Sequence, residues 1–289
     1  MSSGAQTATT TMEAPTESCV TCKRPISENY CSQCGELRAS QRHYTVRHFL
    51  SEIVEGFTHA DHTVWSTLQS LVMKPGELTL AFVRGQRKHL LGPVQLFLLM
   101  NLVFFAVQSL LHGGGPLTPT LEIQKIEPYH NVAMRMIDRS EARSGIPEEE
   151  YVREFDHSIA LRAKSMVIVI VPAFAIFAGV LMVAKRRFLV HHLVFALHFC
   201  SFVLLSLSIA LALLHGAIPL LPKADYEAIV TWSIYCLWAA YLLLAYRRAY
   251  SASWIFSSAA AVASVFAFQW ILYGYRFLML LLTKDTIHA

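Results

Sequence analysis

The chain has 289 residues, of which 54% are hydrophobic and 15% are Asp, Glu, Lys or Arg, and its formal net charge is +4. A soluble domain carries about 25% charged residues, and the mean hydropathy of this chain is +0.42. With 13 glycines and 11 prolines, the composition also excludes collagen-like and disordered classes. We therefore expect an all-α integral membrane protein.

The N-terminal segment contains four regularly spaced cysteines. Residues 1–18 are rich in Ser, Thr and Ala and are predicted to be a disordered tail. Two Cys-x-x-Cys pairs follow, formed by Cys19, Cys22, Cys31 and Cys34. Two such pairs facing each other complete a tetrahedral shell of four sulfurs, which is typical of one structural Zn²⁺. The sequence predicts a zinc ribbon over residues 19–40, with an iron–sulfur or redox dithiol site as the alternative.

Residues 41–89 carry apolar side chains at helical spacing. One amphipathic helix is expected around Val46–Phe57. A second is expected from Asp61, as its cap, to the Lys74-Pro75-Gly76 stop, and a third over Glu77–Val83. Helices of this kind next to a bilayer lie on its cytoplasmic surface or pack against the ends of the spans.

Several motifs in this region occur in a fixed order. They are the Cys-x-x-Cys-Gly ribbon, an aromatic- and His-rich lead-in, Leu71 with Lys74-Pro75-Gly76, the run from Arg84 to Lys88, and Leu91-Gly92-Pro93. Through them, residues 19–110 resemble the bacterial family known as domain of unknown function 3667. The resemblance implies a bacterial inner-membrane location and a layout of a zinc ribbon followed by helices. It implies no activity.

Five stretches are long and apolar enough to cross about 30 Å of hydrocarbon. The predicted spans are residues 90–111, 165–184, 191–214, 228–246 and 252–273. Residues 112–164 form an extracytoplasmic loop with two weak amphipathic helices, around Tyr129–Arg139 and from Pro147. Residues 274–289 are predicted to form a tail, although the apolar character of the chain continues to Leu282.

Basic residues cluster on one side of these spans. The clusters consist of Arg84, Arg87, Lys88, Lys185, Arg186, Arg187, Arg247 and Arg248. Because short cytoplasmic loops retain Lys and Arg, the N-terminus is predicted to be cytoplasmic and the C-terminus extracytoplasmic. These side chains are expected to contact lipid headgroups, so the positive net charge needs no nucleic acid to explain it.

The five predicted spans contain no Asp or Glu. Pumps and intramembrane hydrolases usually depend on buried acids, His chains or metals. The polar residues at or near membrane depth include Gln95 and the five candidate cleft residues Asn101, Gln108, His198, Gln269 and Arg276. They are expected to form hydrogen bonds between helices, with Arg276 reaching outward. The alternative is a polar cleft between spans one, three and five for a lipid headgroup or small solute.

These observations favour a membrane protein without catalysis. The leading hypothesis is a docking, assembly or regulatory platform whose zinc ribbon binds a cytoplasmic protein. A small-solute or lipid transporter that uses the polar cleft is the alternative, and a membrane enzyme acting on lipid is the second alternative. No nucleic-acid partner is expected.

Overall fold

The computed structural model describes residues 17–19, 21–26, 29–34, 61–86, 90–111, 115–185, 188–217 and 223–287. The amphipathic helix predicted around residues 46–57 lies outside them, as does the predicted tail except for its last two residues. Those two residues, Glu17–Ser18, form strand β1, which pairs antiparallel with β2, Pro25–Ile26. The two strands belong to the cysteine-rich unit.

Helices α2 (Asp61–Met73) and α3 (Glu77–Arg84) follow the predicted pattern closely. The turn between them requires Gly76, whose φ is +82°, a conformation that an L side chain adopts only with strain. Gly85, with φ +81°, ends α3 as a C-cap. Both helices pack against the long helix α9 (Leu189–Ala217), and α3 also contacts α10 (Lys223–Tyr250). They therefore pack against the ends of the spans. This is one of the two placements that the sequence predicted, the other being the membrane surface.

Five helices are long and apolar enough to cross a membrane, among the residues the structure describes. The first is α4 (Pro93–Leu110), and the third and fourth are α9 and α10. The second begins as α7 (Glu148–Met166), passes through the 3₁₀ turn η3 (Val167–Val169) and continues as α8 (Ile170–Leu181). The fifth is α11 (Trp254–Thr283). The all-α membrane class predicted from the sequence is confirmed.

Four of the five helical runs are longer than the predicted spans, and the second and the fifth extend furthest beyond them. The second helical run starts at residue 148 rather than 165, and α11 continues to residue 283 before the 3₁₀ turn η6 (Lys284–Thr286). Much of the expected tail is therefore helix. The reason is tertiary: the added turns pack against α5 (Leu121–Ile126), α6 (His130–Ser144) and each other, which a hydropathy window does not register.

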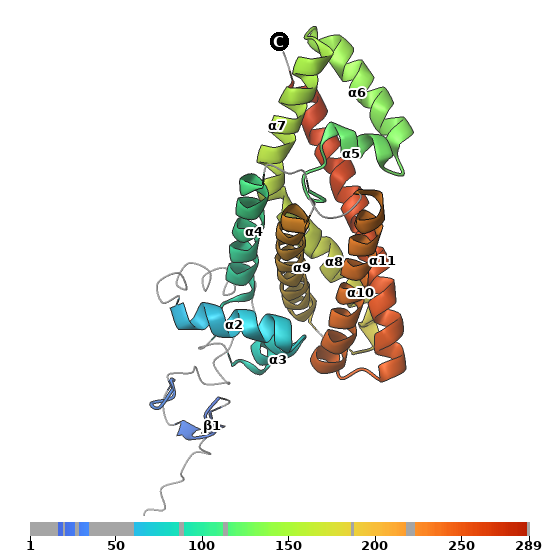
Figure 1. The fold of residues 1–289 in the computed structure, drawn as a ribbon. Helices are drawn as coiled ribbons and strands as arrows, with labels where there is room; N and C mark the ends of the chain where they lie inside the picture. The colour runs from blue at the N-terminus through green and yellow to red at the C-terminus, as the bar shows by residue number, and fades with distance from the viewer. Residues whose placement is uncertain are drawn as a thin grey trace, which may run out of the picture.

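Helix α9 lies at the centre of the bundle, with α4 and α8 packed on it, and α10 packs along α11 (Figure 1). Four aromatic rings join four helices at the core. Phe199 of α9 lies 4.8 Å from Phe174 of α8 and 5.3 Å from Phe268 of α11, ring centre to ring centre. Trp238 of α10 lies 5.4 Å from the Phe268 ring. This buried aromatic cluster fixes how the four helices pack.

The described residues of the predicted basic clusters make their contacts at one end of the bundle. At the end near α2 and α3, Arg248 donates to the Pro75 carbonyl and Lys185 to the Ser251 carbonyl, both at 3.3 Å. Arg247 stacks over the Trp254 ring at 3.8 Å. Helices α5, α6 and α7 cover the opposite end, as Figure 1 shows. The described members of the basic clusters thus share one end, while Arg87, Lys88, Arg186 and Arg187 lie outside the described residues.

Candidate functional site

The four predicted cysteines come together in the N-terminal unit. Their Sγ atoms all lie within 4.8 Å of one another. Cys19 and Cys34 are 3.5 Å apart, and so are Cys22 and Cys31, sulfur to sulfur. All four are free thiols. A tetrahedral Zn²⁺ with Zn–S bonds of about 2.3 Å separates its sulfurs by about 3.8 Å, so the four residues fit a metal ion.

Local backbone geometry prepares these sulfurs to bind a cation. The backbone N–H groups of Cys34 and Gln33 stabilise the Cys31 thiolate and lower its pKa to about 6. At Cys19 burial opposes ionisation, but the N–H groups of Cys22 and Thr21 outweigh it, and the net pKa is lowered. Lys23 makes the turn possible by adopting φ +64°. Two of the four sulfurs are therefore shifted toward the thiolate form, which is the form that binds a metal.

Three of the five candidate cleft residues bind neighbouring elements. Asn101 donates to the Lys164 carbonyl at 2.8 Å, and Gln108 donates to the Thr118 hydroxyl at 2.9 Å. His198 Nδ1 lies 2.9 Å from the Thr79 hydroxyl of α3. The expectation of hydrogen bonds between elements holds for them. These three side chains bind different partners, and none of them lines the cavity described below.

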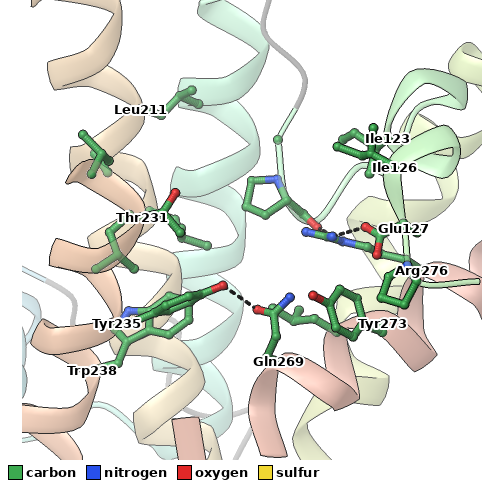
Figure 2. Close-up of a pocket in the computed structure, with 18 of the residues that line it drawn as sticks. Ile123, Ile126, Glu127, Leu211, Thr231, Tyr235, Trp238, Gln269, Tyr273 and Arg276 are labelled. Atoms are coloured by element: carbon green, nitrogen blue, oxygen red, sulfur yellow. Dashed lines mark hydrogen bonds and ion pairs between the residues drawn. The ribbon is translucent and has the colours of Figure 1, made fainter. Parts of the chain in front are cut away.

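A cavity of about 960 Å³ lies instead between α9, α10 and α11, beneath the segment that carries α5 (Figure 2). Its apolar walls come from α9 and α10 and from the α5 segment. They consist of Leu207, Ala210, Leu211, Leu214, Val230, Ile234, Trp238, Ile123 and Ile126. The exposed fraction of Ile126 is 81%. The volume is at the upper end of the 300–1,000 Å³ typical of ligand pockets.

Helix α11 supplies three of the polar residues that line the cavity, and α10 and the segment after α5 supply the others. Gln269 and Arg276, both predicted as cleft residues, line it together with Tyr273. The Tyr235 hydroxyl of α10 donates to Gln269 Oε1 at 2.8 Å, as Figure 2 shows. Two of the five predicted cleft residues therefore face a cavity. Spans three, four and five surround this cavity, whereas the predicted cleft lay between spans one, three and five.

The Arg276 side chain does not reach outward as expected. Its Nε donates to the Pro116 carbonyl at 2.9 Å, and its Nη1 pairs with Glu127 Oε1. The Glu127 side chain is only 3% exposed and that of Arg276 12%. The prediction that Arg276 reaches outward is therefore wrong. Glu127, a buried acid at the end of α5, neutralises the guanidinium inside the fold.

Glu127 is the residue that sequence reasoning missed. It stands 149 positions before its partner and belongs to no recognisable motif. Its second oxygen, Oε2, is buried and has no hydrogen-bond partner among the described residues. Burial and the Glu127 carboxylate also raise the pKa of the nearby Tyr129. The only available signal was Arg276 itself, an arginine in an apolar helix that needs a counter-ion.

Comparison with known proteins shows that the first part of the bundle matches a known family. The family described as "Protein of unknown function (DUF3667)" matches residues 61–105. This region spans α2, α3 and most of α4, so it includes the Gly76 turn but neither the cysteine cluster nor the cavity. No curated protein and no solved structure matches the chain.

Proposed function

We propose that this multi-pass membrane protein binds an amphipathic, lipid-like molecule in the cavity between α9, α10 and α11. The observation that carries the proposal is the composition of the cavity. Helices α9 and α10 supply mostly apolar side chains, and α11 supplies three hydrogen-bonding side chains, beside Tyr235 of α10. A solute that is polar throughout would leave the Leu and Ile wall unfilled, while a molecule with a chain and a polar head satisfies both sides. The polar groups bind and orient the head, and the proposed activity is binding or transfer without catalysis.

The proposed orientation places this cavity in the extracytoplasmic half of the bilayer. Two residues of the predicted basic clusters, Lys185 and Arg248, lie at the α2–α3 end of the bundle. The cavity lies toward the opposite end, beneath α5, and this separation supports the orientation. Together with the family resemblance, it favours a bacterial inner-membrane protein with its N-terminus in the cytoplasm. Five crossings then leave the C-terminus outside. Alkaline phosphatase fused to the C-terminus should be active in cells, and an inactive, stably expressed fusion would refute this orientation.

A pair of tryptophan substitutions on α9 tests the binding. Leu211 lines the cavity, while Leu213 of the same helix is outside it and 66% exposed. Leu211→Trp should fill the cavity and reduce the amount of palmitoyl-chain amphiphile retained in native mass spectrometry several-fold. Leu213→Trp should retain as much as the wild type. Equal retention by the two variants would contradict the proposal.

We also propose that the four cysteines hold one structural Zn²⁺. All four thiolates are used by the metal, which leaves no open position for water and gives the small unit its folding energy. Metal analysis of the purified chain should find one zinc per molecule. Cys31→Ser should lose it, whereas Cys236→Ser should keep it, because Cys236 is an exposed thiol on α10. Bound iron, or zinc retained by Cys31→Ser, would overturn this assignment. A protein partner for the unit stays a prediction.

A further inference from the structure

Three polar side chains face the cavity from one stripe of α11. Gln269, Tyr273 and Arg276 are spaced by four and three residues, so they share one face of the helix. In Figure 2 the Gln269 amide and the Tyr273 hydroxyl both point into the cavity. A mostly apolar helix therefore presents an amide, a phenol and a guanidinium to one cavity.

Each of these groups has a hydrogen to donate. The Gln269 carbonyl oxygen already accepts from Tyr235, which leaves its amide nitrogen as the free end. Arg276 uses Nε and Nη1 for Pro116 and Glu127. Among the described residues, neither the Gln269 nitrogen, the Tyr273 hydroxyl nor Arg276 Nη2 donates to an acceptor of the protein. The stripe is a set of donors without acceptors, which indicates a ligand rich in acceptor oxygens.

The depth of the stripe matches a lipid headgroup. Helix α11 begins at Trp254, at the end of the bundle where Arg247 and Lys185 lie. At 1.5 Å per residue, Tyr273 lies about 28 Å and Arg276 about 33 Å further along the helix. The hydrocarbon of a bilayer is about 30 Å thick. Tyr273 and Arg276 therefore reach the level of the far headgroups. On α10, which ends at Tyr250 on the α2–α3 side, Ile234 lies about 24 Å and Trp238 about 18 Å from that end, at the level of the acyl chains, as does Gln269 at about 22 Å along α11.

The charge of the Glu127–Arg276 pair limits which headgroups the site can bind. Glu127 already balances Arg276, so the site has no net charge before a ligand enters. A guanidinium can bind a second acceptor through its free edge. A multiply charged anion would be repelled by the Glu127 carboxylate, whereas a headgroup with one negative charge meets a smaller repulsion. A phosphodiester satisfies both conditions.

We infer that the α11 stripe of Gln269, Tyr273 and Arg276 binds the phosphodiester of a phospholipid headgroup. Its acyl chain lies against Ile234 and Trp238. This inference deepens the proposed amphiphile binding and depends on it. The ligand is therefore a membrane phospholipid, bound from the leaflet at the α5 end.

Tyr273→Phe is the sharpest test. The substitution removes one hydroxyl that has no partner in the described protein, so it should not disturb folding. Tyr129→Phe is the matched control, because Tyr129 adjoins the Glu127–Arg276 pair without lining the cavity. The full chain in dodecyl maltoside is mixed with 1-palmitoyl-lysophosphatidylglycerol or with uncharged monopalmitoylglycerol. Binding of each is measured by native mass spectrometry, with and without inorganic phosphate.

The wild type should bind the phosphodiester lipid at least tenfold more tightly than monopalmitoylglycerol. Tyr273→Phe should weaken that binding about tenfold, as expected for a hydrogen bond to a charged group, and Tyr129→Phe should leave it unchanged. Equal binding of the two lipids, with no effect of Tyr273→Phe, would overturn the headgroup assignment and leave amphiphile binding intact. Binding of neither lipid would overturn the proposed function as well. Displacement by inorganic phosphate at equal concentration would make the ligand a free anion and refute the lipid assignment.

Discussion

Replacement of Gly76 by alanine should separate the α2–α3 turn from α10. A Cβ at this position would lie 2.7 Å from the Ala245 carbonyl oxygen and 2.9 Å from the Ala245 Cα. Both are backbone atoms, so no side-chain rotation relieves the contact and the two segments must move apart. The left-handed backbone, with φ +82°, adds its own strain.

The cost can be worked out from these two contributions. A side chain in the left-handed region costs about 1–2 kcal/mol, and overpacking of a tight contact costs about 1–3 kcal/mol. Gly76→Ala should therefore lower the free energy of unfolding by about 2–5 kcal/mol. The hydrogen bond from Arg248 to the Pro75 carbonyl lies in the same contact and should weaken with it.

Gly145 provides the matched control. It also has a positive φ, +73°, but a Cβ there would meet no atom within 4 Å. Gly145→Ala should therefore cost only the backbone strain, about 1–2 kcal/mol. Unfolding of both variants by SDS titration, followed by circular dichroism, gives the comparison. If Gly76→Ala is no more destabilising than Gly145→Ala, the reasoning from the close approach to Ala245 is refuted.

Three further substitutions test local features of the fold by the same unfolding assay. Ser253 caps α11 by accepting a hydrogen bond from the Phe256 N–H at 3.3 Å, so Ser253→Ala should cost about 1 kcal/mol; no loss would mean that the cap contributes nothing. Gly274 lies inside α11 with open space around it, so Gly274→Ala should stabilise the protein by about 0.5–1 kcal/mol, and destabilisation would reveal an unseen neighbour. Burial first, and then the Glu127 carboxylate, raise the pKa of Tyr129 above its ordinary value of 10.0. Because a raised pKa favours the neutral form, this contribution to stability is complete below pH 10 and is lost as the pH rises further. Tyr129→Phe should therefore lose less stability than the wild type between pH 9 and 11, and an identical pH profile would contradict the assignment.

Local sequence patterns were enough to determine several parts of this protein. The sparse charge and the five apolar stretches indicated the membrane class, and five long helices are present in the described residues. The paired Cys-x-x-Cys spacing predicted a sulfur cluster, which the fold assembles within 4.8 Å. The Lys74-Pro75-Gly76 stop placed the break between α2 and α3 correctly. These features depend on residues close together in the chain, where hydropathy, ligand spacing and turn chemistry act.

The cavity and its charged pair were decided only by tertiary packing. Helical spacing placed Gln269 and Arg276 on one face of α11, but it carries no information about which helix that face meets. Packing directs that face toward α9 and α10, while Asn101, Gln108 and His198 bind other elements. Glu127 reaches Arg276 only because the α5 segment folds back over the end of α11. A contact between residues so distant in the chain depends on how whole helices fit together, which no local pattern encodes.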